Sequence, residues 1–266
     1  MPNAVRVESW AQLQHELFAE SWDPVLERFR ARVVFRGLSD AGYRLDTTLR
    51  RLGGPYAEIE RHLLRNFRKY AHRNVVERDS IWHWLAVAKH YGLPARLLDW
   101  TSSPYVALHF ATANIERFDA DGVVWVVSYD RVHDRLPARL RDVLAGEGAS
   151  VFTVELLSQA VRSLDELPRL APEPFAIFFE PPSIDDRIVN QYAFFSLLSD
   201  ARLRLDEWLD AHAPDAWRRI EVPADLKWEV RDKLDQAGVN ERVLFPGMDG
   251  LSAWLRRYYS PKARPA

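Results

Sequence analysis

Apolar residues recur at helical spacing in several stretches of the chain, and each stretch predicts a helix. Helices are expected over residues 9–20, 56–77, 80–90, 105–114, 224–237 and 251–259. Ser9 and Ser80 stand where N-caps belong, and Ser103 followed by Pro104 predicts a sharp turn from an extended segment into a helix. In the helix over 56–77, one apolar face is expected from Ile59, Leu63, Phe67 and Tyr70.

Short runs rich in Val, Ile and Phe predict strands. They are expected over residues 32–36, 122–129, 175–179, 192–196 and 217–222. Gly37 should end the first of them. Residues 130–170 are mostly helical and polar, so we expect an insertion on the surface there. The irregular alternation of strands and helices indicates an α+β fold, and the lack of a glycine-rich loop after any strand argues against a Rossmann or Walker-type nucleotide site.

The composition is that of one soluble domain. The 266 residues are 47% hydrophobic, and apolar runs are spread evenly from Val33 to Leu255. A single domain over residues 1–266 is therefore expected. The N-terminus lacks the apolar stretch of a signal peptide, and no run approaches the roughly 18 apolar residues of a membrane span. We expect a cytoplasmic protein without membrane contact.

Composition and spacing also exclude several kinds of chemistry. Cysteine is absent, which excludes disulfides, a thiolate nucleophile and a Cys-ligated metal. The eight histidines show no metal-ligand spacing, so no metal cofactor is expected. Ser102 does not lie in the Gly-x-Ser-x-Gly turn of a hydrolase nucleophile. The net charge of −2 provides no global basic field for nucleic acid.

The tripeptide Phe35-Arg36-Gly37 ends a predicted strand with an arginine. A guanidinium offers five donors in a planar fork that suits phosphate or pyrophosphate, and the backbone of Gly37 can approach a ligand closely. A salt-bridged arginine at a strand end is the alternative interpretation.

Three consecutive hydroxyl residues, Thr101, Ser102 and Ser103, stand where a helix is predicted to begin. Free N–H groups and the positive end of the dipole at this place suit a ligand with phosphates and riboses. The alternative is that Asp99, Ser102 and Ser103 merely cap the helix. Further along, Gln191 precedes an aromatic strand.

A basic stripe lies along the helix predicted over residues 56–77. It consists of Arg61, Arg65, Arg68, Lys69, His72 and Arg73. Such a stripe could follow a nucleic-acid backbone, and Arg61, Arg65 and Lys69 are the predicted contacts. The alternative is a solvated face neutralised by Glu58, Glu60 and Glu77.

In this order, the motifs resemble the FRG-domain family, named for its Phe-Arg-Gly motif. The resemblance extends from about residue 8 to 258. It rests on Phe35-Arg36-Gly37, on His90-Tyr91-Gly92-Leu93-Pro94 continuing through Leu97-Leu98-Asp99-Trp100-Thr101, on residues 107–111, on Arg187 with Gln191, and on Leu244-Phe245-Pro246 with Asp249-Gly250-Leu251.

The motif order of that family is similar to that of ADP-ribosyltransferases of the Arg–Ser–Glu type. The resemblance implies a split mixed β core surrounded by helices, with NAD as the substrate. Arg36 would hold the pyrophosphate or ribose of NAD, and Thr101 and Ser102 would orient the nicotinamide ribose. His90 and Tyr91 would line the nicotinamide pocket.

Gln191 occupies the position where the glutamate of those enzymes would fall. Glutamine can hydrogen-bond a ribose hydroxyl but cannot act as a base. Glu180 is a candidate substitute, although the prolines that follow it favour an ordinary strand end. We expect an ADP-ribosyltransferase of a macromolecule, nucleic acid before protein, with a toxin or phage-defence role. A non-catalytic nucleotide- or nucleic-acid-binding module and an NAD glycohydrolase are the alternatives.

Overall fold

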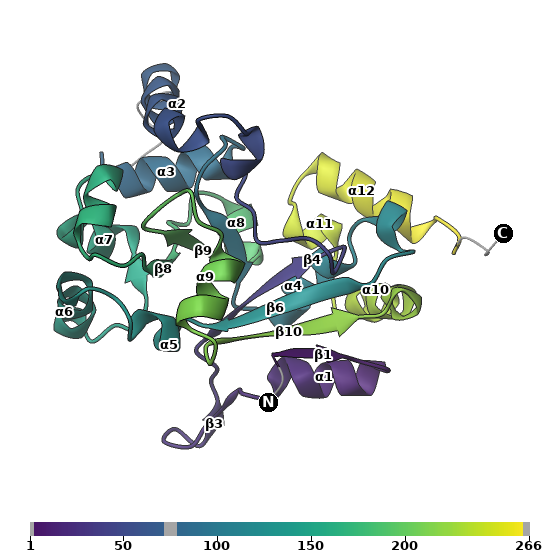
Figure 1. Cartoon of the computed structure of the whole chain (residues 1–266). Coiled ribbons are helices and arrows are strands. Elements are labelled where there is room, and N and C mark those ends of the chain that lie inside the picture. The colour runs from purple at the N-terminus through teal and green to yellow at the C-terminus, as the bar shows by residue number, and fades with distance from the viewer. Residues whose placement is uncertain (1–2, 72–78, 263–266) are drawn as a thin grey trace.

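The computed structural model describes residues 3–71 and 79–262, whose centre is one mixed sheet covered by helices (Figure 1). Within these residues the sheet has eight strands in the order β1-β10-β6-β4-β5-β9-β8-β7. They are β1 (Ala4–Arg6), β4 (Val33–Leu38), β5 (Leu98–Thr101), β6 (Gly122–Ser128), β7 (Phe152–Thr153), β8 (Ala176–Glu180), β9 (Ala193–Leu198) and β10 (Trp217–Val222). The predicted mixed α+β architecture is confirmed.

The sheet divides into two halves between β4 and β5. These two strands are paired only at Phe35 and Thr101, whereas β4 and β6 are paired at six positions and β5 and β9 at four. All neighbours are antiparallel except the edge pairs β1–β10 and β7–β8. The weak junction leaves room beside β4 and β5 for a cavity.

Helices cover both faces of the sheet. They are α1 (Trp10–Phe18), α2 (Tyr56–Tyr70), α3 (Ile81–His90), α4 (Pro104–Ala111), α5 (Tyr129–His133), α6 (Ala138–Glu147), α7 (Val154–Ala160), α8 (Asp186–Asn190), α9 (Leu205–His212), α10 (Lys227–Gln236), α11 (Glu241–Leu244) and α12 (Met248–Tyr258). Short 3₁₀ turns occupy Arg50–Leu52, Ile115–Arg117, Leu164–Arg169 and Ala224–Leu226, and β2 (Trp22–Asp23) pairs with β3 (Arg28–Phe29) in a separate hairpin.

Three apolar cores hold these layers together. Helices α1, α4 and α10 pack on β4, β6 and β10 on one face, and α3, α6 and α7 pack on β8 and β9 in the other half of the molecule. A third core joins both halves of the sheet and is covered by α9. The halves therefore share one core although their strands barely pair.

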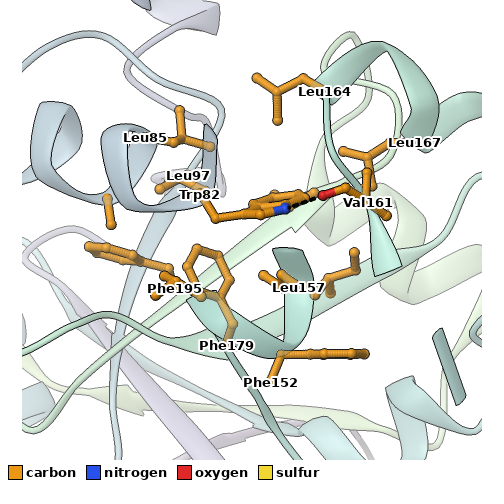
Figure 2. Close-up of a cluster of buried hydrophobic side chains, with 14 of the residues drawn as sticks. Trp82, Leu85, Leu97, Phe152, Leu157, Val161, Leu164, Leu167, Phe179 and Phe195 are labelled. Atoms are coloured by element: carbon orange, nitrogen blue, oxygen red, sulfur yellow. Dashed lines mark hydrogen bonds between the residues drawn. The ribbon is translucent and has the colours of Figure 1, made fainter. Parts of the chain in front are cut away.

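Residues 130–170 contribute to the core, contrary to the expected surface insertion. Phe152, Leu157 and Leu167 are fully buried (Figure 2), and they pack around Trp82 of α3. The indole Nε1 of Trp82 donates to the main-chain oxygen of Val161, 2.8 Å away. Polar residues dominate this stretch in number, but its regularly spaced Leu, Val and Phe residues face inward.

Several other predictions need correction at the ends of elements. β4 continues through Gly37, which pairs with Val124, instead of stopping there. α2 ends at Tyr70, which is 78% exposed and does not belong to the apolar face. Residues 72–77 of that predicted helix, with His72, Arg73 and Glu77, lie outside the described residues. No described helix is both long and apolar enough to cross a membrane.

Candidate functional site

A cavity of about 360 Å³ opens at the junction of the two half-sheets. It is formed by the weakly paired strands β4 and β5, by the start of β9 and by the adjoining ends of α3 and α8. Its lining includes Arg36, Gly37, Lys89, His90, Asp99, Thr101, Phe110, Arg187 and Gln191. Five of the residues predicted from the sequence therefore meet here: Arg36, Gly37, His90, Thr101 and Gln191.

Arg36 projects into this cavity from β4, whose other residues are apolar apart from Gly37. Its side chain is 16% exposed. Nη1 donates to the main-chain oxygen of Asp99 and lies 3.8 Å from the Asp99 carboxylate. Nε is buried without a hydrogen-bond partner among the described residues. Burial lowers the pKa of Arg36, and Asp99 opposes that shift. A desolvated donor of this kind favours an acceptor-rich ligand.

Gly37 permits close packing of a helix. A Cβ at this position would lie 1.8 Å from the main-chain oxygen of Ala107 and 2.6 Å from the nitrogen of Ala111. Both atoms belong to α4, which therefore rests directly on β4. Gly37 lines the cavity, and its lack of a side chain also lets α4, the helix that follows Thr101, Ser102 and Ser103, lie directly against β4.

Lys89 and Asp99 form a second charged pair in the cavity. Lys89 Nζ donates to Asp99 Oδ2 at 2.8 Å, and the lysine side chain is 11% exposed. Partial desolvation in the cavity would raise the pKa of the Asp99 carboxyl, whose side chain keeps 57% of its surface exposed, but Lys89, Arg36 and Arg187 together lower it. From the sequence, Asp99 was predicted only as a helix cap and Lys89 was missed. Lys89 directly precedes His90, and Asp99 directly precedes Trp100-Thr101. This adjacency to motif residues is the sequence signal that could have identified both as site residues.

The three consecutive hydroxyl residues, Thr101, Ser102 and Ser103, make different contacts. Thr101 is buried at the cavity, and its Oγ1 accepts from the amide of Ser103 at 3.0 Å. Ser103 caps α4, as predicted, by accepting from the amide of Val106. Ser102 is exposed, and its amide donates to the main-chain oxygen of Tyr192 at 3.0 Å. This bond joins the start of α4 to the start of β9.

Gln191 lies at the end of α8, just before β9. Its Nε2 donates to the main-chain oxygen of Leu244 at 2.9 Å, and its Oε1 has no hydrogen-bond partner among the described residues. An amide fixed through its nitrogen leaves the oxygen available as an acceptor. Gln191 thus brings to the cavity lining an acceptor that no described residue occupies.

His90 closes the same cavity from α3. Its Nε2 lies 2.7 Å from Oδ2 of Asp185, and Oδ1 of Asp185 caps α8 by accepting from the amide of Ile188. This contact holds the end of α3 against the beginning of α8. Tyr91 is 63% exposed and packs edge-on against His90. Of the described residues predicted to bind NAD, Tyr91 and Ser102 do not line the cavity.

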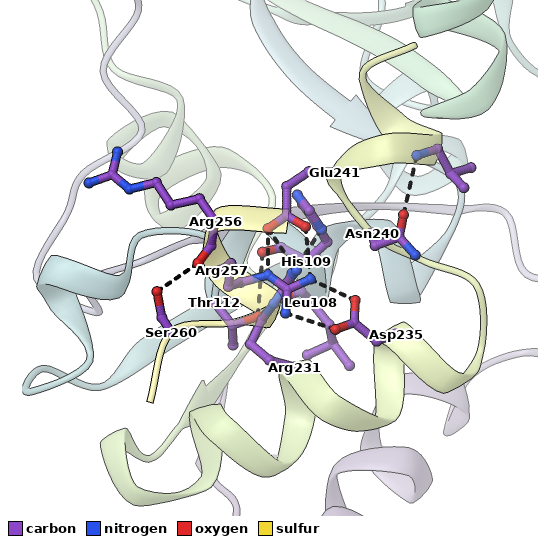
Figure 3. Close-up of polar contacts among 11 residues, drawn as sticks. Leu108, His109, Thr112, Arg231, Asp235, Asn240, Glu241, Arg256, Arg257 and Ser260 are labelled. Atoms are coloured by element: carbon purple, nitrogen blue, oxygen red, sulfur yellow. Dashed lines mark hydrogen bonds and ion pairs between the residues drawn. The ribbon is translucent and has the colours of Figure 1, made fainter. Parts of the chain in front are cut away.

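A buried ionic network fixes α11, which carries the acceptor of the Gln191 bond (Figure 3). Arg257 donates to both carboxylate oxygens of Glu241, and Arg231 Nη2 donates to Glu241 Oε1 at 2.9 Å. Arg257 also binds Asp235, and Arg231 contacts Nδ1 of His109 at 2.8 Å. The network ties α4, α10, α11 and α12 together beside the cavity.

The basic residues of α2 lie on the surface, outside the cavity lining. Arg61, Arg65 and Lys69 are exposed. Glu60, expected as a neutralising partner in the alternative interpretation, faces inward and binds Arg96 through Nε at 2.6 Å. The carboxylate of Glu60 is therefore not available to that stripe.

Glu180 ends β8 and does not line the cavity, so it is not placed to substitute for the expected glutamate. Asp99 is the one carboxylate among the described lining residues. Across residues 3–71 and 79–262, no three His, Asp or Glu residues are grouped as metal ligands.

Comparison with known proteins gives one match, to part of the chain. A family model described as the FRG domain matches residues 31–120. The match includes Arg36, Lys89, Asp99 and Thr101, whereas Gln191 lies beyond it. No curated protein and no solved structure matches the chain.

Proposed function

We propose that the chain is an NAD-dependent ADP-ribosyltransferase that modifies a macromolecular acceptor, with nucleic acid favoured over protein, because residues 31–120 match the family model of the FRG domain. The observation that carries the proposal is the guanidinium of Arg36. It is largely buried at the cavity, and its Nε has no protein partner among the described residues. A pyrophosphate in the cavity would accept hydrogen bonds from the accessible part of this guanidinium.

The charges of the cavity support a dianionic ligand. Arg36, Lys89 and Arg187 contribute three positive charges, and Asp99 contributes one negative charge. The excess of two positive charges suits the two negative charges of a pyrophosphate diester. The volume of about 360 Å³ lies near the lower end of about 300–1,000 Å³ for ligand sites, so the cavity would enclose one part of the dinucleotide.

The chemistry of ADP-ribosyl transfer fits the remaining residues. Cleavage of the ribose–nicotinamide bond gives the ribose oxocarbenium character, so the enzyme must immobilise the ribose and restrict access of water. Thr101 and Gln191, which line the cavity, would hold the ribose hydroxyls. Nicotinamide leaves as a neutral molecule and requires no acid.

The nucleic-acid part of the proposal rests on α2. Arg61 and Arg65 are exposed one helical turn apart and have no ion-pair partner among the described residues, and Lys69 continues the same line. A line of cations at this spacing suits a phosphate backbone.

The test is incubation of the purified protein with labelled NAD and separate DNA, RNA and protein acceptors. Label on one acceptor class is expected, with loss of binding and transfer in Arg36→Ala. Arg28→Ala, an exposed arginine of the β2–β3 hairpin, serves as the matched control and should keep both. Full transfer by Arg36→Ala would overturn the assignment. Bound NAD without turnover would indicate a binding module, and free ADP-ribose without an acceptor would indicate a glycohydrolase.

A further inference from the structure

The Asp99 carboxylate has one fixed and one free oxygen. Oδ2 accepts from Lys89 at 2.8 Å and lies 3.8 Å from Arg36 Nη1, whereas Oδ1 has no hydrogen-bond partner among the described residues. The side chain is 57% exposed although it lines the cavity. A carboxylate oxygen in this state is available to a cation or to a hydroxyl donor of the ligand.

Gln191 cannot supply a negative charge to this cavity, because an amide is neutral. We propose that Asp99, acting in the proposed transferase, is the catalytic carboxylate that stabilises the positive charge of the nicotinamide ring and of the ribose. Gln191 then contributes only a neutral acceptor for a ribose hydroxyl. The negative charge and the neutral acceptor thus come from residues of two different segments.

Atoms and electrons balance in the proposed step. The bond between ribose C1′ and the pyridinium nitrogen breaks, and both electrons pass to that nitrogen, which becomes neutral. The positive charge moves to C1′ and the ring oxygen of the ribose, beside Asp99. A lone pair of the acceptor then forms the new bond to C1′, and the proton of the acceptor leaves to water. Asp99 stabilises charge throughout and takes up no proton.

In this proposal, Asp99 acts on both charged parts of the site, through its main chain and through its side chain. The main-chain oxygen of Asp99 holds Nη1 of Arg36, so Asp99 positions the cation that would bind the phosphates. Its side chain contributes the anion of the same cavity, 3.8 Å from that guanidinium. Lys89, Arg36 and Arg187 lower the pKa of the carboxyl and keep it ionised at neutral pH.

Asp99→Asn separates these two contributions, because it removes the side-chain charge and leaves the main-chain oxygen in place. The experiment compares binding of NAD with binding of ADP-ribose, which lacks the cationic ring, by calorimetry. It also measures nicotinamide release. The ratio of NAD affinity to ADP-ribose affinity should fall about tenfold. Nicotinamide release should fall on the order of 10²-fold, as when one electrostatic contact to a transition state is removed.

Lys89→Gln is the matched variant, because it disrupts the same ion pair but keeps the carboxylate. Affinity for the two ligands should change together there, with their ratio preserved. Retained binding of ADP-ribose by Asp99→Asn reports that this variant is folded.

The outcomes are separable. A selective loss for NAD in Asp99→Asn alone supports the inference. Equal losses for both ligands, or unchanged nicotinamide release, overturn it while the transferase assignment stands. If the native protein binds neither ligand, the proposed function fails and this inference fails with it.

Discussion

Gln191 donates its side-chain amide to the main-chain oxygen of Leu244, 2.9 Å away and 53 positions later in the chain. Asn190 makes a parallel contact with the main-chain oxygen of Val243 at the same distance. The corner between α8 and β9 is therefore attached to α11, and α11 is held by the buried network around Glu241. The direction of the Gln191 amide, and hence of its free oxygen, depends on the C-terminal helices.

Replacement of Gln191 by alanine should keep NAD binding and reduce transfer on the order of 10²-fold, because one positioned acceptor is removed from the reacting ribose. Single-turnover transfer and calorimetric binding measure the two effects separately. Asn190→Ala is the matched control, since it removes an equivalent bond to α11 from a residue that does not line the cavity. Equal losses of transfer in both variants would show that only the attachment to α11 matters.

The Glu241 carboxylate should be a major source of stability. Glu241→Gln leaves Arg231 and Arg257 facing a neutral group in a buried site, and breaking such a pair costs about 3–5 kcal/mol. Urea unfolding followed by tryptophan fluorescence measures the change in free energy of unfolding.

The control is Glu229→Gln, which removes the exposed i,i+4 pair with Lys233 on α10. That pair should contribute only about 0.3–0.5 kcal/mol. A loss below about 1 kcal/mol for Glu241→Gln would mean that the buried network contributes little to stability.

Gly37→Ala should destabilise the fold by about 3 kcal/mol, at the upper end of the cost of overpacking, because the new Cβ meets the backbone of α4 at 1.8 Å. Gly146 offers the opposite case within α6, since a Cβ added there would have no other atom within 4 Å. Gly146→Ala should be neutral or stabilising by about 0.5–1 kcal/mol. The comparison uses urea unfolding of both variants, and equal effects would contradict the assigned role of Gly37.

Local signals predicted the helix starts and the central strands well. Ser9, Ser80 and Ser103 cap the helices that they were expected to cap. These caps were predictable because a serine directly before a stretch of helically spaced apolar residues can be recognised from neighbouring residues alone. β10 matches its predicted range. The short edge strands β1 and β7 and the one-turn helix α11 were missed, since their few residues are ordered by partners far away in sequence.

The site was predicted in part for the same reason. Arg36, Thr101 and Gln191 stand out as polar residues at the ends of apolar strands, and they do line one cavity. Lys89 resembles an ordinary residue of the last turn of a helix. Its pairing with Asp99 depends on the way α3 packs beside β5, which a local pattern does not encode.

Acid should destabilise the protein through its buried histidines. His133 places Nδ1 3.0 Å from the oxygen of Ser150 and accepts from the amide of Phe178 at Nε2, so the native state requires the neutral ring. Burial lowers the pKa of His133 to about 4 and that of His109 to about 3, from 6.5. Below pH 6.5 the unfolded chain therefore binds more protons than the folded one, and stability falls as the pH drops.

Between pH 6 and 4.5, the unfolded chain binds somewhat less than one extra proton at each of these histidines, so each should contribute a slope of about 1.1 kcal/mol per pH unit. Urea unfolding over this range measures the slope of the free energy of unfolding against pH. The variant His133→Gln should reduce that slope by about the contribution of one histidine, although its free energy of unfolding at pH 7.5 should also be lower. An unchanged slope would mean that His133 titrates alike in the folded and unfolded states.

Nucleic-acid binding should depend on the exposed cations of α2. Replacing Arg61, Arg65 and Lys69 together by Gln should weaken binding of every sequence alike, because phosphate contacts carry no sequence information. The slope of log affinity against log salt should fall by about 0.9 for each duplex phosphate that the variant no longer neutralises. Fluorescence anisotropy over a salt series measures both. The control replaces three exposed arginines elsewhere by Gln, namely Arg139, Arg141 and Arg169, with the same change in net charge. If this control lowers the slope as much as the α2 variant, overall charge accounts for the binding and α2 is not its surface.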